Sequence, residues 1–175
     1  MNNFCFLLHS IVVGQRGGFI LGYQIPIINS VVHIVREESF YASNTIEHIV
    51  IVKELLREQE NSADIEVLIE DLNKVYNNVQ KCMPLLNQLE NNALYGHHHP
   101  KFIYELTEEC FGVLQKLCDT SIQFLQILGQ LEGLCEKDLY LLIIQHITIE
   151  ERYGLEVLSG YISQITGEGF RVAAY

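Results

Sequence analysis

Two pairs of histidine and glutamate residues have the types and the spacing that could bind a metal ion. His146 and Glu150 are four residues apart, so their side chains would meet one turn apart on one face of a helix. Glu37 and His48 are separated by about three helical turns and would also share a face. Carboxylate oxygen and imidazole nitrogen together suit iron, manganese or zinc. These four residues are therefore candidate metal ligands.

Apolar neighbours at helical spacing predict that both pairs point into a core. Ionised carboxylates in a core are costly unless they are paired, hydrogen-bonded or bound to a metal. Glu109 lies toward the flank of a third apolar stripe, and the predicted metal site is Glu37, His48, Glu109, His146 and Glu150. Tyr41, Asn44 and Tyr153 would orient these ligands by hydrogen bonds. The buried stripe expected in the last helix comprises Leu139, Leu142, Ile143, His146, Glu150, Tyr153, Val157 and Tyr161.

The same residues also fit a protein without metal. A His–Glu pair at this spacing can be a buried hydrogen-bonded pair, and buried polar groups can set helix register or a dimer interface. His97, His98 and His99 fall in a predicted loop, which favours a loop role or adventitious metal binding. No GxGxxG, P-loop, GxSxG or HExxH pattern occurs. The sequence therefore identifies no catalytic residue.

Four long helices are predicted to position these residues. Helical periodicity begins near Asn29, and helices are expected over 30–59, from 65 to a loop at Asn91, over 100–131 and over 136–165. Pro84 should kink or split the second of them. Short links between long helices favour antiparallel neighbours, which predicts an all-α, up-down-up-down four-helix bundle over residues 30–166. Residues 1–29 are apolar, carry four of the twelve glycines and are predicted to form an irregular arm, and residues 167–175 form a tail.

Composition limits the partners of such a bundle. The 175 residues are 49% hydrophobic, which suits one domain with a sizeable core. The formal net charge is −11 with only 11 Lys and Arg, which argues against nucleic acid and an anionic membrane surface as partners. Five cysteines without a CxxC pair favour reduced thiols in a cytoplasmic protein. The apolar stretch Phe4–Val13 lacks a preceding basic segment and is too short to span a bilayer.

Three segments resemble a bacterial (Firmicute) ferritin-like family of unknown function, whose members are metal-binding helical bundles. They are Glu37-Glu38-Ser39-Phe40-Tyr41 with Ile46-Glu47-His48, the glutamate-rich 105–109, and His146-Ile147-Thr148-Ile149-Glu150. The resemblance spans roughly residues 37–161 and implies ligands at Glu37 or Glu47, His48, Glu109, His146 and Glu150. The chain has one bundle where the family often has two. Arg152-Tyr153 stands near a place where the family tends to show another histidine, which favours one ion or none over a two-metal centre.

Two functions are predicted from these observations. The first is a ferritin-like metal-binding bundle that holds iron or manganese, or else zinc, and whose activity is undefined. The second is a metal-free helical interaction or scaffold protein that self-associates. A homodimer is expected, with no nucleic-acid or membrane partner.

Overall fold

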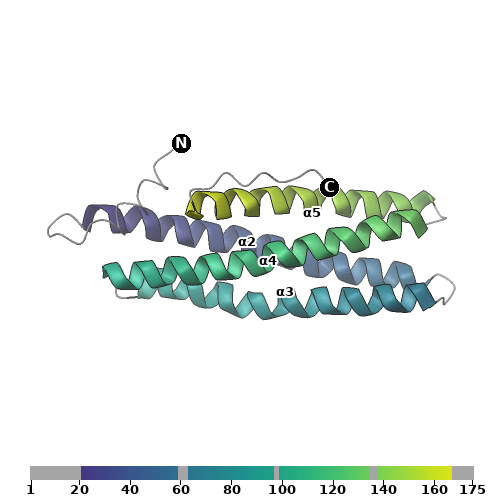
Figure 1. Ribbon diagram of the computed structural model, residues 1–175, viewed down its shortest axis with the longest axis horizontal. Helices are drawn as coiled ribbons and strands as arrows, with labels where there is room; N and C mark the ends of the chain where they lie inside the picture. Colours follow the sequence, from purple (N-terminus) through teal and green to yellow (C-terminus); the bar gives the residue numbers. More distant parts are fainter. Residues whose placement is uncertain (1–20, 59–62, 97–98, 135–137, 167–175) are drawn as a thin grey trace.

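The computed structural model describes residues 21–58, 63–96, 99–134 and 138–166, which are almost entirely helical. The helices are α2 (Leu21–Arg57), α3 (Ala63–Tyr95), α4 (Pro100–Leu134) and α5 (Asp138–Thr166). They form one elongated bundle in which consecutive helices run in opposite directions (Figure 1). The predicted all-α, up-down-up-down four-helix bundle is therefore confirmed.

The start of α2 corrects the predicted arm. The helix begins at Leu21, so residues 21–29 are helical, while residues 1–20 and the predicted tail 167–175 lie outside the described part. Pro26 lies in the second turn, where it removes one backbone hydrogen bond of α2. Ile27 and Ile28 are buried against the bundle, and this packing extends the helix beyond the predicted boundary. Pro84 does not split α3, which continues through it.

The helix ends use ordinary capping chemistry. Asp64 and Glu66 lie in the first turn of α3, and Asp138 lies in the first turn of α5, where negative charge favours the helix dipole. Pro100 is the first residue of α4, as predicted. The Phe102 amide donates a hydrogen bond to His99 Nδ1 over 3.1 Å. His99 therefore caps α4, in agreement with a loop role for this histidine.

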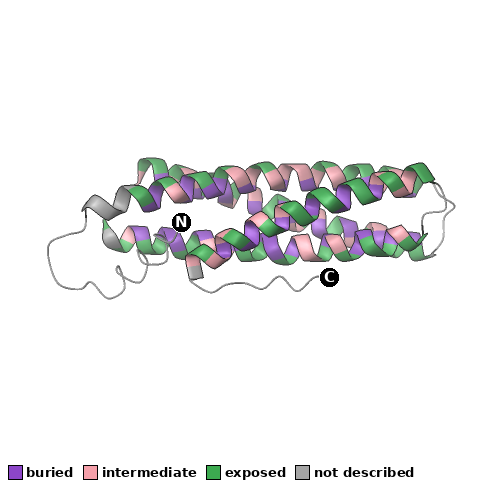
Figure 2. Cartoon of the chain, turned by 90° about the horizontal axis from the view of Figure 1, so that it is seen from above, coloured by how far each residue is buried: buried purple, intermediate pink, exposed green. Residues whose placement is uncertain are grey.

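Polar residues divide the core into two apolar clusters. Each helix carries a buried stripe (Figure 2). One cluster includes Ile27, Val35, Leu86, Leu114 and Leu158, and the other includes Ile49, Leu72, Phe124, Leu128 and Ile144. Along α2, α4 and α5 the two clusters are separated in the chain by buried polar residues, which are Thr45, Thr120, Thr148 and Glu151. This polar layer marks the level of the bundle at which the candidate site lies.

Three cysteines belong to the first cluster. Cys82, Cys110 and Cys118 are free and buried, whereas Cys5 and Cys135 lie outside the described residues. Burial raises the pKa of the Cys110 thiol to about 12. Such a thiol stays protonated and behaves as a small apolar side chain. Among the described helices, none has a stretch long and apolar enough to cross a membrane.

Candidate functional site

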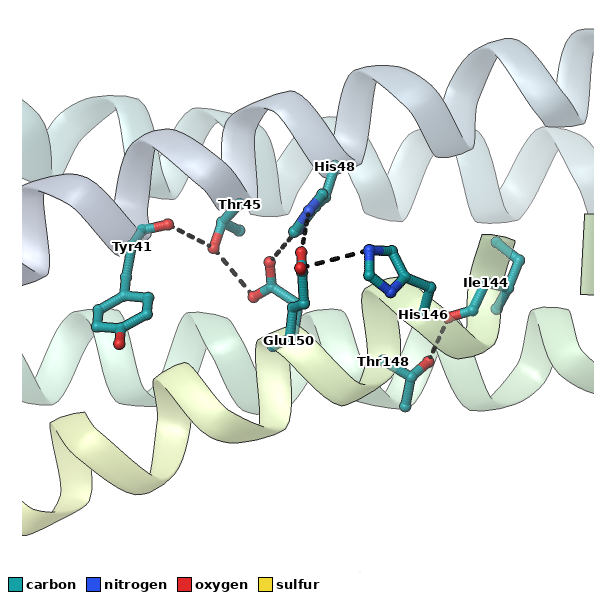
Figure 3. Close-up of polar contacts among 8 residues, drawn as sticks. Tyr41, Thr45, His48, Ile144, His146, Thr148 and Glu150 are labelled. Carbon is teal, nitrogen blue, oxygen red and sulfur yellow. Dashed lines mark hydrogen bonds and ion pairs between the residues drawn. The ribbon is translucent and has the colours of Figure 1, made fainter. Parts of the chain in front are cut away.

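His48 is the centre of a polar cluster between α2 and α5. Its Nδ1 lies 2.7 Å from Glu151 Oε1, and its Nε2 lies 3.1 Å from Glu150 Oε2 (Figure 3). Only 13% of the His48 side chain is exposed. Because both ring nitrogens face carboxylate oxygens, both act as donors when the ring is the imidazolium ion. The hydrogen bond to Glu151 raises the pKa of His48 above its usual range and outweighs burial, which lowers it.

Glu151 is the buried anchor of this cluster, and the sequence analysis missed it. Its Oε1 faces His48, and its Oε2 accepts a hydrogen bond from Thr45 Oγ1 over 3.0 Å. The residue is 5% exposed. Its neighbours at helical spacing are buried as well: Ile147 lies four residues before it, Leu155 four after it and Leu158 seven after it. This helical spacing places Glu151 on the core face and was visible in the sequence.

The predicted pair of His146 and Glu150 exists, but it lies at the surface. His146 Nε2 is 3.3 Å from Glu150 Oε1, and the two side chains are 71% and 49% exposed. The stripe predicted to be buried in the last helix is therefore wrong: Leu139, Leu142 and Tyr153 are also exposed. Apolar residues occupy two faces of α5, and the bundle buries the face that contains Ile144, Ile147, Leu155 and Leu158.

Glu37 and Glu109 do not join the cluster. Glu37 accepts a hydrogen bond from the Tyr161 hydroxyl and lies 3.6 Å from His33 Nε2. Eleven residues of α2 separate it from His48, which is about 16 Å along the helix. Glu109 is exposed on α4. The structure thus brings together three of the five predicted ligands, which are His48, His146 and Glu150.

The four side chains are arranged as a row of pairs. His146 contacts Glu150, Glu150 contacts His48, and His48 contacts Glu151. Within the described ranges, no group of three or more His, Cys, Asp or Glu side chains is disposed to hold a metal ion. The donor types suit iron, manganese or zinc, but in this arrangement they bond to one another. Metal binding would therefore require them to rearrange.

A cavity of about 470 Å³ adjoins the cluster. Its lining includes Tyr41, Asn44 and Tyr153, which were predicted to orient the ligands. Val79, Leu117, Leu155 and Leu158 supply apolar wall. A Cβ atom at Gly154 would lie 3.2 Å from Tyr41 Cδ1. The glycine therefore leaves the space in which the Tyr41 ring packs against α5.

A second buried carboxyl group, Glu38, also lines this cavity and was not predicted as a site residue. It is 2% exposed, and its Oε1 has no hydrogen-bond partner among the described residues. Burial, followed by the charge of Glu37, raises the pKa of Glu38 to about 8. Glu38 is thus mainly neutral at pH 7. Its helical spacing to Val35, Ala42 and Thr45, all buried, was the available signal in the sequence.

Comparisons of the chain with models of protein families, with curated proteins and with solved structures found no match. The resemblance to a ferritin-like family therefore stays a prediction based on three short segments. The links between helices are short throughout, whereas ferritin-like bundles have one long crossover connection.

Proposed function

We propose that the chain is a metal-binding helical bundle whose ligands are His48, His146, Glu150 and Glu151. The observation that carries this proposal is the largely buried His48 between two carboxylates of α5, one of which also pairs with a second histidine. Two imidazoles and two carboxylates are a donor set for iron or manganese, and also for zinc. Bundles build metal sites from such side chains on facing helices. This set replaces Glu37 and Glu109 of the sequence prediction with Glu151.

Binding would exchange a proton for the metal ion. A ligating imidazole must be neutral, whereas the contacts of His48 with Glu150 and Glu151 favour its imidazolium form. Metal affinity is therefore expected to increase with pH as the His48 proton is lost. Thr45, which donates to Glu151, would continue to orient that carboxylate.

Metal analysis of protein purified without a histidine tag tests the proposal. The chain is loaded separately with Mn²⁺, with Fe²⁺ under anaerobic conditions and with Zn²⁺, and the bound metal is measured by mass spectrometry after gel filtration. About one equivalent is expected in the wild type, and much less in a variant carrying His146→Ala and Glu150→Gln. Glu156→Gln is the matched control, because Glu156 is an exposed glutamate on the same helix.

A variant with His97, His98 and His99 replaced by asparagine separates the cluster from adventitious binding at that tract. The proposal predicts that this variant still binds one equivalent. Absence of stoichiometric metal in the wild type, or full binding by the variant altered at His146 and Glu150, would reject the proposed site.

A second candidate function is self-association without metal, and the exposed face of α5 favours it. Leu139, Leu142, Ile149 and Tyr153 are each at least 60% exposed. Together with His146 they follow an alternating spacing of three and four residues, which is typical of helices that pack along a common seam. An exposed apolar stripe marks an interaction surface. The occupant we propose is the same stripe of a second copy, because a two-fold dimer joins identical patches.

The mass of the metal-free chain in solution tests this second function. Sedimentation equilibrium is expected to give a dimer for the wild type and a monomer for the double variant Leu142→Glu and Ile149→Glu. Val67→Glu is the control, because Val67 is an exposed apolar residue of α3. A wild-type monomer at all concentrations, or a dimer that survives the double substitution, would exclude the α5 stripe as the interface.

A further inference from the structure

The cavity lined by residues of all four helices contains a carboxyl group that the proposed metal site does not use. Glu38 is the most buried of its titratable residues, and its Oε1 lacks a hydrogen-bond partner among the described residues. Buried polar atoms in native proteins almost always have a partner, and each exception needs an explanation. A ligand in the adjoining cavity would supply one if the Glu38 side chain turned toward it, because Oε1 itself has less than 1 Å² of accessible surface.

The shape of the cavity suits a small organic molecule. Its volume of about 470 Å³ lies within the range of ligand pockets. Phe40 and Tyr153 are 61% and 60% exposed, so they mark the open side, whereas Glu38 lies on the closed side. Tyr41 packs edge-on against both rings, at centroid distances of 5.6 Å and 6.3 Å. The cavity thus passes from an aromatic rim to a buried carboxyl group.

The charges around the cavity favour a cation. Among the described residues, the charged or titratable groups of its lining, other than tyrosines, are the carboxyl groups of Glu38, Glu150 and Glu151 and the imidazole of His48, with no Lys or Arg. His48 is already bonded to Glu150 and Glu151. Its positive charge is therefore paired and does not attract an anion into the cavity. The chain as a whole carries a formal charge of −11. This potential draws cations in and repels carboxylates and phosphates.

We infer that the cavity binds a small organic amine, with its ammonium group against Glu38 and its apolar body among Phe40, Tyr41 and Tyr153. An ammonium ion can donate to the Glu38 carboxylate once this side chain turns toward the cavity, and such charge-assisted bonds are the strong ones. The faces of aromatic rings also attract ammonium groups. This binding does not require a metal ion, because Glu38 is not one of the proposed metal ligands, although three of those ligands line the same cavity.

Three probes with the same aromatic body test the inference. 2-Phenylethylamine, 2-phenylethanol and phenylacetate differ in their polar group, and their binding to the full chain is measured by calorimetry at pH 8 after removal of metal with a chelator. The amine is expected to bind at least about tenfold more tightly than the alcohol, because a hydrogen bond to a charged group is worth about that factor. Phenylacetate is expected not to bind. Hexylamine and spermidine extend the amine series to other bodies.

Substitution at Glu38 shows which group selects the amine. Glu38→Gln keeps the shape of the side chain and is expected to reduce the preference for amine over alcohol to within about twofold, since the ionic part of the hydrogen bond is lost. Glu47→Gln, an exposed glutamate on the same helix, is the control and should keep the preference. Circular dichroism verifies the fold of both variants.

The inference is overturned if the amine and the alcohol bind equally, if phenylacetate binds more tightly, or if none of the three amines binds. A preference that survives in Glu38→Gln also overturns it. Should that variant not fold, the carboxyl ¹³C resonance of Glu38 in the wild type gives the answer. It must shift when 2-phenylethylamine is added and stay unchanged with 2-phenylethanol.

Discussion

Glu151 and Glu38 are two buried carboxyl groups of one cavity, and the bundle accommodates them in different ways. Both oxygens of Glu151 have partners on α2, which are His48 and Thr45. Glu38 has an oxygen without a partner among the described residues, and burial keeps it mainly protonated at pH 7. The comparison shows that a buried carboxyl group can be stabilised either by hydrogen-bond and ion-pair partners or by remaining protonated. The partners of Glu151 connect α5 to α2, whereas the protonated Glu38 can ionise when a ligand binds.

The strongest test of this difference removes Glu151. Glu151→Ala leaves the largely buried His48 without its shortest contact and Thr45 without an acceptor on α5. Breaking a buried charge pair in this way is expected to lower the free energy of unfolding by about 3–5 kcal/mol. Urea denaturation at pH 6 measures it, with Glu156→Ala on the exposed face of α5 as the control. A loss below about 1 kcal/mol would show that Glu151 does not anchor the two helices.

A second test uses the proton on Glu38. Because its pKa is raised from 4.5 to about 8, the folded chain holds a proton there that the unfolded chain releases between these pH values. The stability from this proton is complete below about pH 4.5 and is lost as pH rises through about 8. Glu38→Gln removes this dependence. Between pH 4.5 and pH 9 the variant should gain about 4 kcal/mol relative to the wild type, because each pKa unit is worth about 1.4 kcal/mol.

Urea denaturation of both proteins at several pH values measures this gain. The comparison between variant and wild type cancels the titration of His48 and of the other groups. Parallel stability curves would mean that Glu38 is ionised in the folded chain, and that the contrast with Glu151 is wrong.

The hydrogen bond from Thr45 separates the contributions of the partners of Glu151. Thr45→Val keeps the volume of the side chain and removes a donor to a buried carboxylate. The free energy of unfolding is expected to fall by about 1 kcal/mol. Thr120→Val is a matched control, because the Thr120 hydroxyl bonds to the Lys116 carbonyl within its own helix. Each substitution is made in the wild type and in Glu151→Ala. If Thr45→Val lowers the free energy of unfolding by the same amount in both backgrounds, as Thr120→Val should, the hydrogen bond between Thr45 and Glu151 contributes nothing.

The smallest effect is expected at Glu150, the exposed neighbour of Glu151. Its side chain is 49% exposed, and exposed ion pairs contribute little. Glu150→Gln should change the free energy of unfolding by less than about 0.5 kcal/mol. NMR titration should also show a smaller decrease of the His48 pKa in Glu150→Gln than in Glu151→Gln. The reverse order would make Glu150 the main partner of His48.

The fold was largely predictable from the sequence, because long apolar periodicity and short links allow few other arrangements. The start of α2 was not, since Pro26 and nearby glycines favour irregular structure locally, whereas burial of Ile27 and Ile28 favours a helix. Tertiary packing decided that boundary.

The candidate site was predicted only in part, for a reason that lies in α5. This helix is apolar on two faces, so its periodicity alone did not determine which face is buried. The choice of the face with His146 and Glu150 excluded Glu151, one residue further along the chain. Glu37 and His48 share a side of α2, but periodicity gives no information on which of them reaches α5.

The three buried cysteines make the interior of the bundle observable without an added probe. Cys82, Cys110 and Cys118 lie in the apolar cluster beside the cavity, and burial raises the pKa of each. Thiol reagents attack the thiolate, so modification of these residues requires the helices to separate. With Cys5 and Cys135 replaced by serine, the labelling rate of the remaining three thiols measures how often the protein opens transiently under native conditions.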